Sequence, residues 1–352
     1  MSEQWTWSPA QLDRLRDFLD EHDVLHGSLT LRPIGDGHSN LTYLVTDGER
    51  EVVLRRPPPP PTPPGAHDML REAQLIGALE GSEVPVARVL AVAQRDDVID
   101  VPFYVMTYVR GPVATTGSPP HLANPAERRR VGESLVATLA ALHAVDWRAA
   151  GLENMGKPKG FNLRHVKRMA ALVADDDGNP PDDFAPVDAW LRANAPAESG
   201  EAIIHNDFRL GNVILGPDTP GRVVAVLDWE LATIGDPLFD LGYFLSSYPV
   251  AGEERTPTED LGTSLLEDGY PTRDEIAAMY AARTGADLSA LPWYVAMAQW
   301  KLAVLYEYGH RRAIAGVGDP YYADRGLVVS FLRAAHRAAG LPWSRGTSAS
   351  SS

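Results

Sequence analysis

The segment IIHNDFRLGNVIL, residues 203–215, encloses polar side chains between two short apolar runs that are typical of buried strands. It contains Asp207 and Asn212, and another acid, Asp228, follows the next strand-like run. Oxygen ligands of this kind suit Mg²⁺, which also binds substrate phosphates. Phosphoryl transfer requires such a set, because one Asp orients the attacking hydroxyl while an Asn and a second Asp hold the metal. The order H-x-D-x-x-x-x-N, with a further D roughly twenty residues later, matches the catalytic loop of kinases.

The alternative is a turn with polar caps at strand ends, which explains most isolated acids in loops. Here Asp207, Asn212 and Asp228 fit one template together, so the sequence favours catalytic and metal-binding roles for them. His205 is expected to be a packed histidine that hydrogen-bonds the loop backbone rather than a general base. Arg209 is predicted to act beside Asp207 by pairing with a substrate or phosphate oxygen, although a structural salt bridge explains it equally well.

The composition of the whole chain limits the classes of protein to which it can belong. Its 352 residues, 44% hydrophobic and 22% charged, suffice for a globular protein of two lobes. The lack of cysteine excludes disulfides, thiolate metal sites and a cysteine nucleophile. A formal net charge of −15 argues against a nucleic-acid partner, which requires a basic surface. Acidic surfaces of this kind usually serve solubility.

Neither an export signal nor a membrane span is predicted. The first residues, MSEQWTWSPAQLDRLRDFLDEH, lack the basic and apolar regions of a signal peptide. No apolar run approaches the roughly 20 residues that cross a bilayer. We therefore expect a soluble, cytoplasmic protein without a membrane partner, and the sequence indicates no particular oligomeric state.

The predicted elements divide the chain into two parts near residue 110. Residues 1–110 are rich in short strand-like runs, and Asp47-Gly48 between two of them predicts a hairpin. Residues 111–340 are mostly helical and contain the segment with Asp207, and residues 341–352 are expected to be a disordered tail. We predict an α+β fold, with an N-terminal antiparallel sheet lobe for a nucleotide and a larger helical lobe for the catalytic and metal site. The ligand is expected between them.

Three segments of the strand-rich part are candidates for holding the nucleotide. IGDGHSN joins two strand-like runs and can place backbone N–H groups over phosphates. EVVLRRP offers Arg55 or Arg56 as a cation on the third strand, with Glu72 of the next helix as its partner. FYVMTYVRG can present backbone groups to the edge of adenine. The predicted nucleotide-binding residues are Gly35, Gly37, Ser39, Asn40, Arg55, Glu72, Met106, Thr107 and Val109.

These motifs resemble the aminoglycoside phosphotransferase and choline kinase-like family. The resemblance covers most of the chain, through GDGHSNLTYLV, VVLRRPP, REAQLIGAL, PFYVMTYVRG, HNDFRLGNVIL and VLDWELATIGDPLFDLGYF. The last two motifs are highly specific together, whereas the glycine-containing loop alone is not. Within the family, the chain looks most like the kinase-like N-terminal domains of acyl-CoA dehydrogenase family homologues and their bacterial relatives.

The resemblance implies a bilobal protein-kinase-like fold and a small-molecule kinase that transfers the γ-phosphoryl group of ATP or GTP to a hydroxyl with Mg²⁺. It implies that Asp207 is the catalytic base and that Asn212 and Asp228 are metal ligands. It places Arg55 at the position of the β3 cation and Glu72 as its helical partner, with residues 107–109 as the adenine-binding hinge. Asp236 and Asp240 are expected to cap and anchor the helix that follows them.

Three departures from the family pattern concern the site. The β3 cation is Arg55 rather than lysine, and arginine can still bind two phosphate oxygens. Asn206 stands where relatives often have glycine, and asparagine tolerates positive φ better than most residues. Asp228 is followed by Trp-Glu rather than Phe-Gly, so a flip of this segment of the protein-kinase type is not expected.

The sequence leaves the acceptor open between an aminoglycoside, a macrolide, a hydroxyacyl-CoA and another metabolite. An aminoglycoside pocket needs clustered acids, and residues 253–275 are acidic, although a solvated loop is the favoured interpretation. The family resemblance favours hydroxylated acyl-CoA-like or other metabolic acceptors. Basic residues within the segment 164–168 could serve such an acceptor, but a solvated helix face explains them more simply.

Two other functional classes fit the sequence less well than a kinase does. A catalytically silent nucleotide-binding pseudokinase, acting through partners, would usually have lost one of Asp207, Asn212 and Asp228, which are all present. A hydrolase that uses His205 and Asp207 is disfavoured because the sequence has no G-x-S-x-G motif near them.

Overall fold

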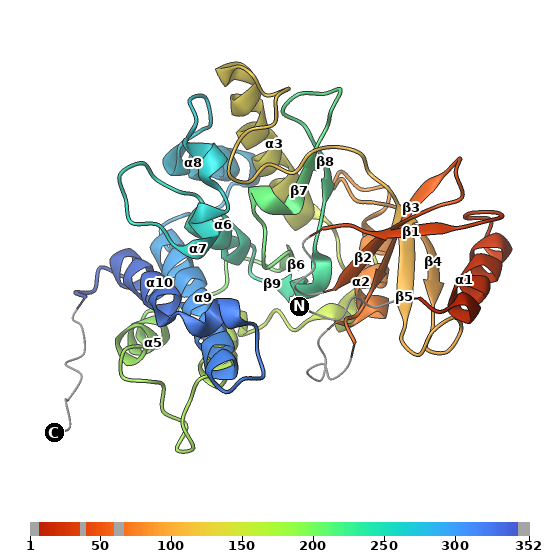
Figure 1. Cartoon of the computed structure of the whole chain (residues 1–352). Helices are drawn as coiled ribbons and strands as arrows, with labels where there is room; N and C mark the ends of the chain where they lie inside the picture. Colours follow the sequence, from red (N-terminus) through yellow and green to blue (C-terminus); the bar gives the residue numbers. More distant parts are fainter. Residues whose placement is uncertain (1–6, 36–39, 60–66, 344–352) are drawn as a thin grey trace.

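The computed structural model describes residues 7–35, 40–59 and 67–343. Two groups of elements lie side by side in it, a sheet with two flanking helices and a larger group of helices (Figure 1). This is the α+β architecture with two lobes that the sequence predicts. No helix within the described ranges is long and apolar enough to cross a membrane.

The sheet of the smaller lobe has five antiparallel strands in the order β1-β2-β3-β5-β4. Side chains alternate between the two faces of a strand. In β3, Val52 and Leu54 therefore join the core on one face, while Val53 and Arg55 line a cleft on the other. The strands are β1 (Thr30–Pro33), β2 (Leu41–Thr46), β3 (Glu51–Arg56), β4 (Val89–Ala93) and β5 (Phe103–Thr107).

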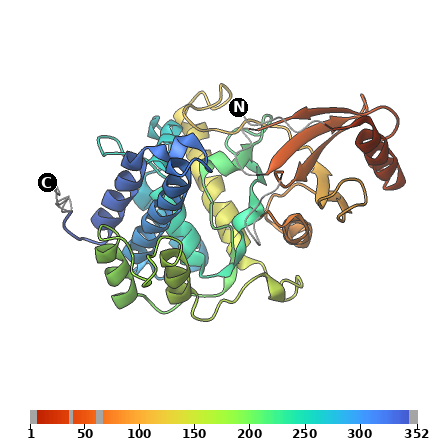
Figure 2. The same cartoon turned by 60° about the horizontal axis from the view of Figure 1, so that its bottom comes forward.

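Helix α1 (Pro9–Glu21) covers the face of the sheet that points away from the helical lobe (Figures 1 and 2). It begins with a capping box in which Ser8 accepts the N–H of Gln11, as the Ser8-Pro9 sequence predicts. Its Leu15 and Leu19 are fully buried in a core that they share with the sheet.

Helix α2 (Met69–Leu79) connects the sheet to the rest of the protein. Its buried Leu75 and Ile76, together with Tyr104 of β5, belong to the same apolar core as the helical lobe. The sheet lobe thus has its own core on the α1 side and shares the core of the helical lobe on the α2 side, and the boundary predicted near residue 110 stays a prediction.

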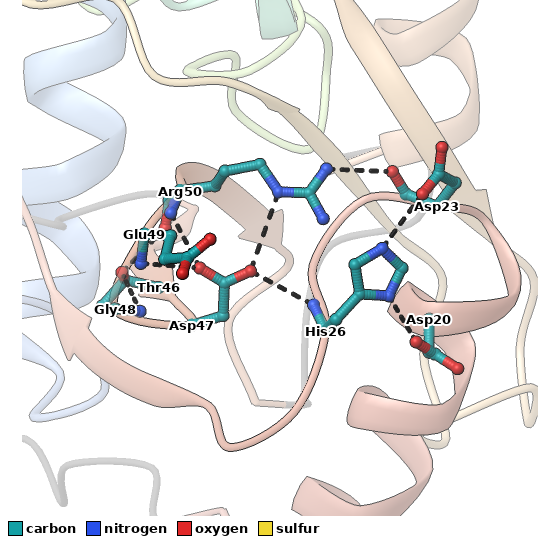
Figure 3. Close-up of polar contacts among 8 residues, drawn as sticks. All are labelled: Asp20, Asp23, His26, Thr46, Asp47, Gly48, Glu49 and Arg50. Carbon is teal, nitrogen blue, oxygen red and sulfur yellow. Dashed lines mark hydrogen bonds and ion pairs between the residues drawn. The ribbon is translucent and has the colours of Figure 1, made fainter.

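Asp47 fixes the turn of the β2–β3 hairpin to the loop after α1 (Figure 3). Its Oδ1 accepts the N–H of Arg50 at 2.7 Å, and its Oδ2 accepts the N–H of His26 at 3.2 Å. Backbone hydrogen bonds, that of Arg50 first, lower the pKa of Asp47 to about 2. The imidazole of His26 lies between Asp20 and Asp23, and hydrogen bonds to these carboxylates raise its pKa. The predicted hairpin is thus present, with its turn held by charged groups.

The helical lobe is built around α9 (Leu291–Ile314), which packs against both α6 (Pro237–Ser246) and α10 (Arg325–Ala338). Trp300 of α9 is fully buried in this core. The other helices of the lobe are α3 (Pro125–Ala144), α4 (Phe161–Ala170), α5 (Ala185–Ala193), α7 (Pro257–Asp260) and α8 (Arg273–Thr284).

Two short antiparallel strand pairs lie between these helices and the sheet lobe (Figure 1). In the second pair, Val213 lies opposite Val226. The residues before one strand and after the other therefore become neighbours, which places Asn212 near the segment that leads to Asp228. The pairs are β6 (Ala202–Ile204) with β9 (Thr233–Gly235), and β7 (Val213–Leu215) with β8 (Val223–Val226).

Gly111, between β5 and α3, approaches β7 closely. A Cβ atom at this position would lie 2.2 Å from the carbonyl oxygen of Leu215 and 2.5 Å from Cγ2 of Ile214. We predict that Gly111→Ala lowers the free energy of unfolding by about 2 kcal/mol or more, because backbone on both sides must shift. Urea unfolding measures this. The control is Gly117→Ala, whose Cβ would meet nothing within 4 Å, and equal effects of the two substitutions would contradict the prediction.

Candidate active site

The loop that follows β6 is hydrogen-bonded to a buried carboxylate of α6. Asp240, fully buried, accepts the backbone N–H groups of His205 and Asn206, each at 2.6 Å. Asn206 has φ of 69°, so the chain turns sharply just before Asp207. The expectation that Asp236 and Asp240 cap α6 is correct only for Asp236, the N-cap residue. The side chain of Asp240 reaches the loop instead, because the first turn of α6 faces it.

His205 is a structural residue of this loop. Its Nε2 lies 2.8 Å from the carbonyl oxygen of Leu227, and its Nδ1 faces the N–H of Asp207 at 3.3 Å. The carbonyl can only accept and the amide can only donate, which assigns the proton to Nε2. The ring also packs against Trp229, with centroids 4.8 Å apart. Both nitrogens are occupied, as expected for a packed histidine and not for a general base.

Asp207 and Asn212 are joined directly. The Asn212 side-chain amide donates to both the carbonyl oxygen and Oδ2 of Asp207, each at 2.8 Å. Arg209 forms an ion pair with the other carboxylate oxygen of Asp207, with its Nε 3.6 Å from Oδ1. Burial first, and then the charge of Asp207, raises the pKa of the neighbouring Tyr243 hydroxyl.

Asp228 follows β8 in a left-handed conformation, with φ of 65°. The N–H of Leu227 donates to the carbonyl oxygen of Asn212 at 2.8 Å, so the segments that carry Asn212 and Asp228 run side by side. Both residues line the same cleft. The Asn212 amide group donates through nitrogen and leaves its oxygen without a partner in the described part of the chain. One amide oxygen and one carboxylate form a donor set that fits Mg²⁺ together with phosphates and water.

Arg55 crosses from the sheet lobe to Asp228. Its Nη2 lies 2.6 Å from Oδ1 of Asp228, and its Nε lies 3.0 Å from Oε1 of Glu72. Tyr104 also donates to Glu72, at 3.0 Å. Burial raises the pKa of Glu72 to about 7, against the opposing effect of Arg55. The other candidate cation, Arg56, points to the opposite face of β3 and does not line the cleft.

Further contacts join the two lobes beside Asp228. The side-chain amide of Asn40 donates to Oε2 of Glu230 at 2.9 Å. Arg71 of α2 donates to the carbonyl oxygens of Met155 and Ala232 at 3.0 and 2.6 Å. The two residues after Asp228 have different structural roles. Trp229 is buried in the core against His205, whereas Glu230 contacts Asn40 of the other lobe.

The cleft between the lobes has a volume of about 420 Å³. Its walls combine apolar side chains with Arg55 and Asp228, the combination expected of a nucleotide site. Within the described residues, no partner is seen for the N–H of Val109, the last hinge residue. Asp207 and Arg209 do not line this cleft, and Gly37 and Ser39 lie outside the described residues. The predicted site residues that do line it are Gly35, Asn40, Arg55, Glu72, Met106, Thr107, Val109, Asn212 and Asp228.

The acidic stretch of residues 253–275 is only in part a solvated loop, because it contains α7 and the start of α8, while Glu253, Glu254 and Asp268 are exposed. Glu259 is buried and pairs with Arg273, and Glu267 pairs with Arg128. Glu275 caps α8, and its pKa is lowered to about 2, first by the hydrogen bond from Arg129. Glu259, Glu267 and Glu275 are thus held in structural contacts.

Two buried polar side chains near the site were not predicted as part of it. His165, expected on a solvated helix face, is buried and stacked on Phe161. Lys301, within the apolar run of α9, donates to Asn206 at 2.7 and 2.8 Å. A single lysine among apolar residues, in AMAQWKLAVL, was the signal in the sequence for a buried cation.

A strand-rich lobe over a helical lobe, with an Arg–Glu pair facing two metal-type ligands, is the arrangement of kinase-like phosphotransferases. The chain matches the phosphotransferase enzyme family over residues 30–294 and belongs to that family.

Curated relatives are longer than this chain. It is 38% identical over 301 residues to acyl-CoA dehydrogenase family member 11 of Gallus gallus. These residues make up 82% of this chain and 38% of the relative. It is 30% identical over 309 residues to acyl-CoA dehydrogenase family member 10 of Mus musculus, covering 86% of this chain and 28% of the relative. The chain therefore spans less than half the length of both relatives.

Solved structures support the fold. A candidate aminoglycoside phosphotransferase from Ralstonia eutropha has a TM-score of 0.77 and 27% identity, over 92% of this chain and 98% of that one. The aminoglycoside phosphotransferase APH(4)-Ia, in a ternary complex with AMP-PNP and hygromycin B, has a TM-score of 0.57 and 17% identity over 92% and 98%. Aminoglycoside 2'-phosphotransferase-IIIa with GDP has a TM-score of 0.59 and 17% identity over 95% and 99%. The predicted bilobal kinase-like fold is confirmed.

The raised pKa of Glu72 gives a pH dependence that can be tested without a substrate. A carboxyl whose pKa rises from 4.5 to about 7 on folding stabilises the protein fully below 4.5, and this contribution is lost as the pH rises through 7. From pH 5 to 8, we expect the wild type to lose on the order of 2 kcal/mol more stability than Glu72→Gln. Urea unfolding at both pH values measures this, with the exposed Glu83→Gln as the control. Equal losses in the wild type and in Glu72→Gln would contradict the assignment.

Proposed function

We propose that this protein is a small-molecule kinase that transfers the γ-phosphoryl group of ATP or GTP to a substrate hydroxyl, with Mg²⁺ as the metal. One observation carries the proposal. Asp207 is hydrogen-bonded to Asn212, and Asn212 shares its cleft with an Asp228 that is paired to Arg55. The groups that would serve as proton acceptor, metal ligands and phosphate-binding cation therefore lie in adjoining positions, which supports phosphoryl transfer.

In this proposal the nucleotide lies in the cleft, with its purine against the apolar wall formed by β3 and β5. The N–H of Val109 and the backbone of Thr107 would meet the edge of the purine, and Met106 packs beside it. Asn40 and Gly35 lie at the phosphate end. Arg55, held by Glu72, would bind phosphate oxygens. Solved family members contain AMP-PNP in one case and GDP in another, so both nucleotides belong in the test.

Mg²⁺ would be held by Asn212 and Asp228 and would neutralise phosphate charge. Asp207 lies outside the nucleotide cleft and next to Asn212, on the side from which an acceptor would approach. Its carboxylate is placed to accept the proton of the attacking hydroxyl while the Asn212 amide holds Oδ2 in position. Roles are thus divided between a base on the acceptor side and metal ligands on the nucleotide side.

The acceptor is proposed to be a hydroxylated metabolite rather than an aminoglycoside. An aminoglycoside is polycationic and calls for unpaired acids, but Glu259, Glu267 and Glu275 are held by arginines. The acyl-CoA dehydrogenase family relatives, of which this chain spans less than half, make hydroxyacyl-CoA esters the first acceptors to try.

The first test is nucleotide consumption with Mg²⁺ over hydroxyacyl-CoA esters, choline-like alcohols, sugars, aminoglycosides and macrolides, with Asp207→Ala as the blank. We expect at least one acceptor to raise turnover well above that blank. Measurable Mg·ATP binding without turnover on the panel would favour the pseudokinase alternative, a nucleotide-binding protein that acts through partners.

Substitution of the two acids should separate their roles. Asp207→Ala is expected to abolish transfer and leave nucleotide affinity within about twofold, because Asp207 does not line the nucleotide cleft. Asp228→Ala is expected to remove the Mg²⁺-dependent part of nucleotide affinity. Turnover and calorimetric titration measure both, with the exposed Asp218→Ala as the control. Wild-type turnover in both variants would show that the site is assigned wrongly.

Arg209 is proposed to contact the acceptor or the phosphoryl group in transfer, because it faces Asp207 and is absent from the nucleotide cleft. In Arg209→Met, we expect kcat/KM for the acceptor to fall about tenfold or more, with nucleotide affinity retained. Steady-state kinetics and nucleotide titration measure the two quantities. A variant with unchanged kcat/KM would leave only the structural salt bridge to Asp207.

A further inference from the structure

Lys301 of α9 is buried beneath the loop that carries Asp207. Its Nζ donates to the carbonyl oxygen of Asn206 at 2.8 Å and to Oδ1 of the same residue at 2.7 Å. The residue is only 3% exposed, and no carboxylate lies within the 4.0 Å of Nζ that defines an ion pair in the described part of the chain. An ammonium group is thus buried with two neutral oxygens as its hydrogen-bond acceptors.

The surroundings make this position unfavourable for a charge. Burial lowers the pKa of Lys301 to about 8, and Arg168 acts in the same direction. Asp207 and Asp240 oppose the change without touching the ammonium group. The rings of Phe239 and Tyr243 flank Nζ at 5.4 and 5.0 Å. The nearby His165 has a strongly lowered pKa, first through burial and then through the charge of Lys301. Packing alone would be better served by a methionine of similar length.

Asn206 is the residue that this lysine fixes. All four of its polar groups are used, because its N–H donates to Asp240 at 2.6 Å and its Nδ2 donates to the carbonyl oxygen of Leu231 at 3.1 Å. Its two oxygens both accept from Lys301. The left-handed backbone conformation of Asn206 is thus held by a carboxylate at its N–H and by an ammonium group at its oxygens.

The carbonyl oxygen of Asn206 belongs to the peptide group whose N–H is that of Asp207. That N–H faces Nδ1 of His205 at 3.3 Å. Lys301 and His205 therefore hold opposite edges of one peptide plane. A change in the ψ angle of Asn206 would turn this plane and move the Cα of Asp207, and a displacement of about 1 Å at a catalytic group can cost on the order of a hundredfold in rate.

We propose that Lys301 is a positioning residue that sets the direction of the Asp207 carboxylate by fixing the Asn206–Asp207 peptide group through Asn206. This inference rests on the proposed function, in which Asp207 receives the proton of the acceptor. Lys301 lies behind the loop and does not contact a substrate. Substitution of Lys301 is therefore expected to change kcat and not the affinity for the nucleotide.

The test compares two buried residues of the same helix. Lys301→Met removes the contact to the loop, whereas Gln299→Met removes a similarly buried hydrogen bond, from Nε2 to the carbonyl oxygen of Ser246 at 2.9 Å. We expect Lys301→Met to lower kcat at least tenfold while the Kd of the nucleotide stays within twofold. Gln299→Met is expected to retain kcat within twofold, even though thermal unfolding reports a loss of stability. Equal kcat values in the two variants would overturn the proposal.

Asn206→Gly provides a second, milder variant. Glycine adopts the same positive φ and keeps the carbonyl oxygen, but it removes the Oδ1 acceptor of Lys301. We expect kcat to fall severalfold, and the effects of Asn206→Gly and Lys301→Met to be less than additive in the double variant. Full additivity would overturn the coupling, and if Lys301→Met does not fold, an unchanged kcat in Asn206→Gly would overturn it alone.

A readout without turnover separates this inference from the proposed function. Hydrogen exchange of the peptide that spans residues 203–213 should rise in Lys301→Met and stay unchanged in Gln299→Met, whether or not an acceptor is known. Increased exchange without turnover in the wild type on any acceptor of the panel would support the loop contact and favour the pseudokinase alternative over the kinase. Turnover in the wild type with unchanged exchange and kcat in Lys301→Met would reject the positioning role and retain the kinase.

Discussion

The relative position of the two lobes depends on the ion pairs of Arg55. This guanidinium group is largely buried between Glu72 of the sheet lobe and Asp228 of the helical lobe, so each lobe supplies one of its counter-charges. Removing one partner from such an arrangement leaves a buried charge uncompensated, at a cost of about 3–5 kcal/mol. The relative positions of β3, α2 and the segment after β8 are therefore set together. A lysine has a single nitrogen and could not bind Glu72 and Asp228 through different nitrogen atoms of one rigid plane. This difference gives a physical reason for arginine, rather than lysine, at position 55.

The loop with Asp207 depends on the helical lobe in a similar way. Asp240 of α6 and Lys301 of α9 approach it from the same buried side, one binding N–H groups and the other binding oxygens. Because α6 and α9 pack directly on each other, the two charges are part of the hydrophobic core as well as of the site. The carboxylate of Asp207 is bound by neither of them, so in the proposed function buried contacts fix the loop while this side chain faces the acceptor.

Much of this arrangement could be predicted from sequence because it depends on local patterns. Strand alternation and chain order place Arg55 and Glu72 on neighbouring elements, and spacing relates Asp207, Asn212 and Asp228 to one template. The contacts of Lys301 with Asn206 and of Asn40 with Glu230 join residues 95 and 190 positions apart, and no periodicity reports them. The ion pairs of Glu267 with Arg128 and of Glu275 with Arg129 likewise join residues more than a hundred positions apart, so the sequence did not indicate them.

The hydrogen bond between Asn40 and Glu230 has a consequence for the thermodynamics of binding. It joins the lobes through protein side chains, as the Arg55–Asp228 pair does. Contacts of this kind hold the walls of the cleft in place, so a ligand that binds there has less of the protein to order. Affinity gained in this way comes from a smaller entropic penalty rather than from additional contacts.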